Sequence, residues 1–215
     1  MPRLLALFFI FLMVSMSACR CPPDEEVGTL SLSPEALGFL PYSGAEALTF
    51  ARADGQELTF TAPRGEQAGT DQVCVRTICT EARYNSPSSC EFYTAGNRRY
   101  VFVSDDNRHL IDLLLYSALH EEDTENFYDA LQVGYSAGAP AIQGNTAIVP
   151  RFSGSFVASE VPFSSPLLKV STVELNGRQY TDVLQKAEGN LAIYLQPGKG
   201  VIAISENGNV YTLVE

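Results

Sequence analysis

The chain has 215 residues and a net charge of −11, from 14 basic and 25 acidic side chains. Such an acidic surface disfavours nucleic acid and anionic lipid headgroups as partners. The length allows one domain, or two small ones, with enough chain to bury a hydrophobic core. The sequence contains no phosphate-binding loop and no dinucleotide fingerprint, so we expect no cofactor.

The first residues have the composition of a secretory signal peptide. Arg3 provides a positive charge, an apolar run covers residues 4–14, and small side chains precede Cys19. The apolar run is shorter than the roughly 18 residues that a membrane-spanning helix needs. We therefore expect residues 1–18 to be removed after export.

The segment from Met16 to Cys19 resembles the lipobox of bacterial lipoproteins, with Met at the position where Leu is usual. The resemblance implies that Cys19 becomes the first mature residue and anchors the protein in the membrane through two or three acyl chains, since one chain binds only marginally. Residues 19–27 would then form an extended tether. The alternative is an ordinary signal peptide cut near Ala18, which leaves Cys19 a plain thiol.

Acidic residues shortly after Cys19 resemble the export signals of Bacteroidota lipoproteins. That resemblance implies a location at the bacterial outer membrane, on its periplasmic or external side. The last strands, from the one that contains Tyr194 to the chain end, also resemble those of small uncharacterised envelope lipoproteins of Bacteroidota. The resemblance supports a compartment and an architecture and transfers no catalytic residue.

Alternation of apolar and polar side chains predicts strands almost everywhere after residue 28. In the first part of the chain we expect strands at 29–33, 47–52, 57–62, 72–84, 89–94, 99–104, 109–119 and 125–136. Residues 109–119 also fit a short helix, but an acidic turn after them favours a hairpin with 125–136. The Gly-, Ala- and Pro-rich stretch 134–145 is expected to be a loop. A seam near 136–146 is the alternative to a single β-rich domain over 28–215.

The last third of the chain has the clearest pattern. Strands are expected at 147–152, 155–159 and 167–175, and then in the four segments that follow tight turns. These turns lie at 176–177, 188–190, 197–200 and 207–208, and the Asn-Gly pairs among them are strong hairpin signals. Successive tight turns describe an antiparallel meander. We therefore predict an all-β fold, a mainly antiparallel meander arranged as a β-sandwich or a partly open barrel.

Besides Cys19, the cysteines are Cys21, Cys74, Cys79 and Cys90. Export permits disulfides, and four cysteines allow three complete pairings. A turn near residues 85–87 would bring Cys79 opposite Cys90, which is the pairing we favour, and Cys74 with Cys90 is the alternative. A zinc site built from the last three cysteines is disfavoured because their spacing lacks the close C-x2-C pairs of structural zinc sites.

One motif suggests an enzyme. The pentapeptide GYSAG around Ser136 matches the nucleophile elbow of α/β-hydrolases, in which a serine lies on a sharp turn between a strand and a helix. Residues 139–144 are a poor helix start. The base histidine should follow the serine, whereas His109 and His120 both precede it. A serine hydrolase is therefore the less favoured hypothesis, and a glycine-rich loop after a strand fits better.

Both histidines lie among carboxylates. His109 follows Asp105 and Asp106, and His120 precedes the acidic residues 121–123. Imidazole and carboxylate groups together suit zinc or another divalent ion, yet these residues fall in predicted turns, where charge is usually solvated. No metalloprotease or calcium-loop spacing occurs. We predict no metal site.

The sequence thus predicts an exported, lipid-anchored protein of the bacterial cell envelope with a non-catalytic role. It would bind a partner protein or a small apolar ligand, or act as a structural accessory. The alternative is a lipocalin-like or half-barrel carrier of an apolar ligand, which requires inward positions that are apolar yet unfilled.

Overall fold

A computed structural model describes residues 21–80, 88–120, 123–138, 141–150 and 163–214, with the backbone alone for 120, 123–126, 149 and 150. Within these ranges the chain forms thirteen strands and one short helix. They are β1 (Glu25–Leu30), α2 (Pro34–Phe39), β2 (Ala47–Arg52), β3 (Glu57–Thr61), β4 (Glu66–Cys79), β5 (Ser89–Ser104), β6 (His109–His120), β7 (Asp123–Ala137), β8 (Ala141–Pro150), β9 (Leu168–Leu175), β10 (Arg178–Glu188), β11 (Leu191–Gln196), β12 (Gly200–Glu206) and β13 (Asn209–Leu213). The predicted all-β class is confirmed.

The chain divides into two compact units. Unit 1 contains Met1–Thr29 and Gln72–Thr94, and unit 2 contains Leu30–Asp71 and Ala95–Glu215. The long strands β4 and β5 contribute residues to both units.

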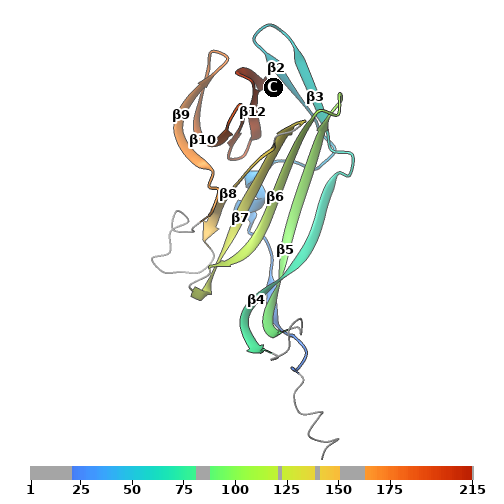
Figure 1. Cartoon of the computed structure of the whole chain (residues 1–215), viewed down its shortest axis with the longest axis vertical. Coiled ribbons are helices and arrows are strands. Elements are labelled where there is room, and N and C mark those ends of the chain that lie inside the picture. Colours follow the sequence, from blue (N-terminus) through green and yellow to red (C-terminus); the bar gives the residue numbers. More distant parts are fainter. Residues whose placement is uncertain (1–20, 81–87, 121–122, 139–140, 151–162, 215) are drawn as a thin grey trace, which may run out of the picture. The chain divides into compact units, whose positions relative to one another are not determined.

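Unit 2 is a curled antiparallel sheet, a half-barrel, in which the strands follow the order β8-β7-β6-β5-β3-β2-β13-β12-β11-β10-β9 (Figure 1). Two meanders, β5 to β8 and β9 to β13, are joined through the β2–β3 hairpin. The joint is a long-range pairing between β13 and β2, with Leu213 opposite Phe50. The predicted meander and partly open barrel are therefore confirmed.

The concave face of this sheet carries the main core. Phe102 of β5, Ile111 of β6 and Tyr135 of β7 are successive cross-strand partners, and all three are buried. The two ends of the sheet also meet, because β10 contacts β8 and β11 contacts both β7 and β8. The half-barrel interior is therefore filled by side chains from both meanders.

The short helix α2 was missed by the strand-based prediction. Ser33 is its N-cap, with its Oγ accepting from the Ala36 N–H at 3.1 Å, and Pro34 stands at the first helical turn. A serine N-cap followed by proline and an acidic residue is a recognisable helix start. The helix contacts β8 in the folded chain.

The predicted loop over 134–145 is wrong. Most of this stretch continues β7 and begins β8, and the two strands form a close hairpin in which Ser136 pairs with Ala141. Likewise β5 is one continuous strand rather than two. Residues 109–119 do form a strand paired with β7, as the hairpin prediction requires. The predicted strand at 155–159 lies outside the described residues.

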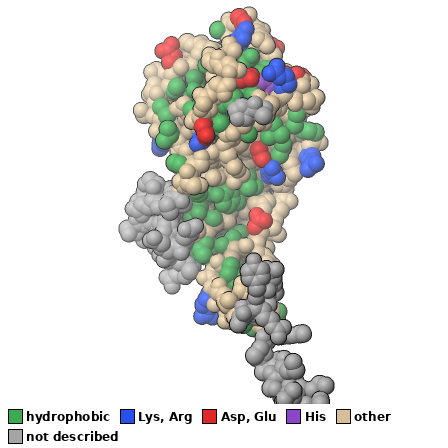
Figure 2. Space-filling model, viewed as in Figure 1, with side chains coloured by type: hydrophobic (Ala, Val, Ile, Leu, Met, Phe, Trp, Pro, Cys, Tyr) green, Lys and Arg blue, Asp and Glu red, His purple; other side chains and the backbone are tan. Residues whose placement is uncertain are grey.

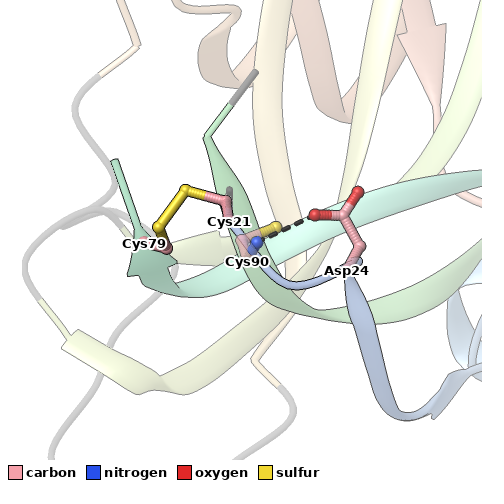
Figure 3. The surroundings of a disulfide bond; sticks show 4 residues. All are labelled: Cys21, Asp24, Cys79 and Cys90. Atoms are coloured by element: carbon pink, nitrogen blue, oxygen red, sulfur yellow. Dashed lines mark hydrogen bonds between the residues drawn. A yellow bond between two sulfur atoms is a disulfide. The ribbon is translucent and has the colours of Figure 1, made fainter. Parts of the chain in front are cut away.

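Unit 1 contains β1, the end of β4 and the start of β5, and both β1 and β4 pair with β5. Cys21 forms a disulfide with Cys79 (Figure 3). The Cys90 N–H donates to Asp24 Oδ1 at 2.9 Å, and Thr94 Oγ1 donates to Glu26 Oε1 at 2.6 Å. These contacts hold the first described residues to the paired strands.

Two expectations are corrected here. Cys79 bonds to Cys21 and not to Cys90, while Cys74 and Cys90 are free thiols. The segment expected as a tether over 19–27 is part of unit 1 from Cys21 onward. Both errors have one cause: β1 and β4 both pair with β5, which brings together cysteines 58 positions apart, and no local pattern encodes that contact.

Candidate functional site

A cavity of about 490 Å³ lies in unit 2 where the two ends of the sheet meet, and we call it the seam cavity. Its walls come from α2, β8, the segment 163–167, β9, β10 and the turn after β11. The lining residues are Phe39, Asn145, Thr146, Ala147, Ile148, Phe163, Pro166, Leu167, Lys169, Asp182, Leu184 and Pro197. The cavity thus exists only because residues far apart in the sequence are brought together.

Most of the wall is apolar. Phe39 projects from α2, Ile148 from β8 and Leu184 from β10, and Leu167 is buried between them and the core. Gly144 makes room for Leu167, because a Cβ at position 144 would lie 2.6 Å from Leu167 Cδ2. Such a wall favours the apolar part of a ligand.

The segment beside β8 is fixed by hydrogen bonds. The Asn145 N–H donates to the Ser165 carbonyl at 2.9 Å, and the Leu167 N–H donates to the Asn145 carbonyl at 3.0 Å. Ser165 Oγ donates to the Gln143 carbonyl and accepts from Lys186 Nζ, both at 2.8 Å. Lys186 belongs to β10, so this last bond links the two ends of the sheet beside the cavity.

Few polar groups line the cavity, and one has no partner. Asn145 Oδ1 is buried and makes no hydrogen bond within the described structure. A buried acceptor without a partner costs free energy. Lys169 and Asp182 are exposed lining residues, and Asp182 has a φ of +52°. Non-glycine residues in this left-handed region are uncommon and concentrate at functional sites.

His109 occupies a buried polar cluster rather than a metal site. Its Nδ1 lies 3.2 Å from Tyr135 Oη, and its Nε2 lies 3.9 Å from Glu206 Oε2. Asp106 accepts a hydrogen bond from Ser104 Oγ at 2.5 Å. This bond is the main cause that lowers the pKa of Asp106, and burial acts in the opposite direction. The cluster joins β6, β7 and β12 and fits a structural role.

Across the described residues, no three His, Cys, Asp or Glu side chains are grouped so that they would hold a metal ion. The side chain of His120 lies outside the description. The four described cysteines of unit 1 form one disulfide and two free thiols rather than a tetrahedral cluster.

Ser136 does not lie on a nucleophile elbow. It is a strand residue paired with Leu110 on one side and Ala141 on the other. Tyr135, which contacts His109, is its neighbour in β7, and successive side chains in a strand point to opposite faces. The serine hydroxyl and the imidazole are therefore on opposite faces of the sheet, so His109 cannot act as the base for Ser136.

The outer face of the sheet also carries apolar side chains. Figure 2 shows hydrophobic atoms gathered over the region of β6 and β7. Tyr128 and Ala130 of β7 form a small buried cluster with Ala147 of β8, and Phe163 covers Tyr128 with the ring centroids 6.1 Å apart. Phe163 thus connects this outer cluster with the seam cavity that it lines.

Comparisons with protein-family models, curated proteins and solved structures found no match. The part of the chain that the structure describes contains no helix with the length and apolar character required to cross a membrane.

The sequence did not reveal the seam cavity. Asn145 was placed in a predicted loop and Phe39 in no element at all, although Ser33 and Pro34 carried a helix-start signal. Nothing local indicates that residues 145 and 165–167 pair, because that bridge depends on how the sheet closes.

Proposed function

We propose that this chain is an exported, lipid-anchored envelope protein that binds a small, largely apolar ligand in the seam cavity of unit 2. The role is binding rather than catalysis.

The observation that carries the proposal is the seam cavity itself, which has a mostly apolar wall and few polar lining residues. Ligand sites typically have volumes of roughly 300–1,000 Å³ and combine apolar walls with few polar groups, and the seam cavity has about 490 Å³. The half-barrel fold is compatible with a binding module or a carrier.

The cavity favours a small ligand over a long lipid chain. A carrier of the lipocalin type keeps its ligand among unfilled inward positions. Here inward residues such as Phe102, Ile111 and Leu195 are fully buried against one another. The space available for a ligand is at the seam and not along the barrel interior.

The membrane and envelope parts of the proposal rest on the signal-like leader and on the lipobox resemblance at Cys19. The Cys21–Cys79 disulfide in unit 1 supports export, because disulfides persist in oxidising compartments.

A pair of matched variants tests the cavity. Thr146 is half-buried in the cavity wall, whereas Thr172 of β9 is exposed and outside it. Thr146→Trp should fill the cavity and weaken binding of the fluorescent apolar probe phenylnaphthylamine at least tenfold, or about 1.4 kcal/mol. Thr172→Trp should bind the probe like the wild type. Fluorescence titration measures both dissociation constants.

Equal affinity in both variants would place the probe elsewhere, and no binding by the wild type would contradict the cavity proposal. Native mass spectrometry of protein isolated from its own envelope would then identify a retained natural ligand by its mass.

A further inference from the structure

Unit 1 brings together more cysteine chemistry than one disulfide uses. Besides Cys21 and Cys79, it contains the free thiols Cys74 in β4 and Cys90 in β5, two strands that pair with each other. The two thiols are close enough for Cys74 to affect the pKa of the Cys90 thiol. An ion pair between Arg76 and Glu91 joins the same stretches of the two strands. Cysteines on paired strands can lie at the Cα–Cα separations that a disulfide requires, roughly 4.4–6.8 Å.

The two thiols differ in access. Cys74 is exposed and Cys90 is half-buried. The neighbouring Cys74 thiol is the main cause that raises the pKa of Cys90, to about 11. The thiolate is the nucleophile, and a raised pKa lowers the fraction of Cys90 that is a thiolate. Cys90 is therefore the less reactive of the two cysteines as long as Cys74 is a free thiol.

We propose that Cys74 and Cys90 are a reversible dithiol pair that reacts with small-molecule disulfides of the glutathione type and closes a second disulfide beside Cys21–Cys79. The inference does not rest on the seam cavity or on its ligand.

The reaction proceeds by two exchanges. The Cys74 thiolate attacks one sulfur of the small disulfide, forms a mixed disulfide and releases one small thiolate, which takes up the proton that Cys74 lost. Cys90 then loses its proton to the solvent, and its thiolate attacks the Cys74 sulfur and releases the second small thiolate, which is protonated in turn. The cysteine pair loses two electrons and the small disulfide gains them. Excess small thiol reverses both steps.

Solvent access makes this pair the labile one. Exposed disulfides are generally the more easily reduced and the more often regulatory. Attack by glutathione on a closed Cys74–Cys90 bond would occur at the exposed sulfur of Cys74.

The sequence allows a clean assay, because trypsin separates the four cysteines. Cleavage after the arginines at 20, 52, 64, 76, 83 and 98 leaves Cys21, Cys74, Cys79 and Cys90 each on its own peptide. Full-length protein is equilibrated in buffers with increasing ratios of oxidised to reduced glutathione, alkylated, digested and analysed by mass spectrometry. We expect a crosslink between peptides 65–76 and 84–98 that rises with oxidised glutathione and disappears when reduced glutathione is restored. The Cys21–Cys79 crosslink should stay unchanged.

Two variants separate the steps. In Cys90→Ser, glutathione should remain attached to Cys74 because the second exchange is blocked. In Cys74→Ser, modification at Cys90 should be slower than modification of Cys74 in the first variant, because Cys90 is half-buried and Cys74 is exposed. The retained Cys21–Cys79 crosslink shows that unit 1 is intact in both.

Three results would overturn the proposal. The first is glutathione attached to both Cys74 and Cys90 of the wild type without a crosslink between them. The second is a crosslink that joins Cys90 to Cys21 or Cys79, and the third is a Cys74–Cys90 crosslink that reduced glutathione cannot open.

Discussion

At the residue scale, one tyrosine connects distant segments of unit 2. The Val201 N–H donates to Tyr42 Oη at 2.7 Å, and the Tyr42 ring contacts Tyr100 and Phe102 edge-on, with centroids 5.7 and 5.1 Å away. Burial raises the pKa of Tyr42 to about 12. The contact requires glycine at position 200, where φ is +77° and a Cβ would lie 2.1 Å from the hydroxyl oxygen.

This contact predicts different costs for two glycine substitutions. Gly200→Ala and Gly198→Ala both place a side chain at nearly the same positive φ, but the space beside Gly198 is open. The backbone strain shared by both should cost about 1 kcal/mol. Overlap with Tyr42 should add about 1–3 kcal/mol in Gly200→Ala alone. Urea unfolding measures both free energies, and equal destabilisation would show that the Tyr42 contact does not constrain position 200.

At the element scale, a buried carboxylate positions α2. Asp129 of β7 is fully buried, and it accepts from the Ser33 N–H at 3.0 Å and from Ser117 Oγ at 2.7 Å. Ser33 is the N-cap, so the start of α2 is fixed to the sheet by this bond. The helix in turn supplies Phe39 to the seam cavity. A charged side chain on a core-facing strand is thus a positioning residue for the cavity wall.

Replacing this carboxylate should affect both stability and the cavity. In Asp129→Asn, an amide NH2 replaces one of the two accepting oxygens and leaves one donor without its acceptor, so we expect a loss of about 2–3 kcal/mol. Ser33→Ala is the control: it removes only the capping hydroxyl and should cost about 1 kcal/mol. Unfolding in urea gives these values. Phenylnaphthylamine affinity should fall further in Asp129→Asn than in Ser33→Ala, and the reverse order would contradict the assigned role.

The elements differ in how far the sequence predicted them. The hairpins after residue 175 were predicted because Asn176 and Asn207 take positive φ beside glycines, which is a local requirement of tight turns. The stretch 134–145 was misassigned because its Gly and Ala content suggested a loop. There, Gly144 serves packing against Leu167 rather than a turn. Composition alone does not distinguish these two uses of glycine.

At the scale of the whole molecule, the features that sequence could not predict are those that depend on long-range contacts. The joint between β13 and β2, the Cys21–Cys79 bond and the bridge between Asn145 and Pro166 have no local signature. The seam cavity depends on the last of these. The fold class was predictable from alternation and turns, whereas the candidate site was not.

The predicted anchor and the observed disulfide have a joint consequence. Cys21 belongs to unit 1 and lies two residues after Cys19, and two extended residues span about 7 Å. Acylation of Cys19 would therefore hold unit 1 next to the bilayer, with no long tether between them. The two cysteines would have separate roles, one in anchoring and one in the disulfide.

Substitution of each cysteine separates these roles. Cys19→Ala should move the protein from the detergent phase to the aqueous phase in Triton X-114 partitioning, because it removes the acylated side chain. Cys21→Ser should stay in the detergent phase, since it leaves the lipobox intact, and should lose only the crosslink to Cys79. Aqueous partitioning of the wild type would favour an ordinary signal peptide. Detergent partitioning of Cys19→Ala would mean that another part of the chain binds the membrane, because the acyl chains are then absent.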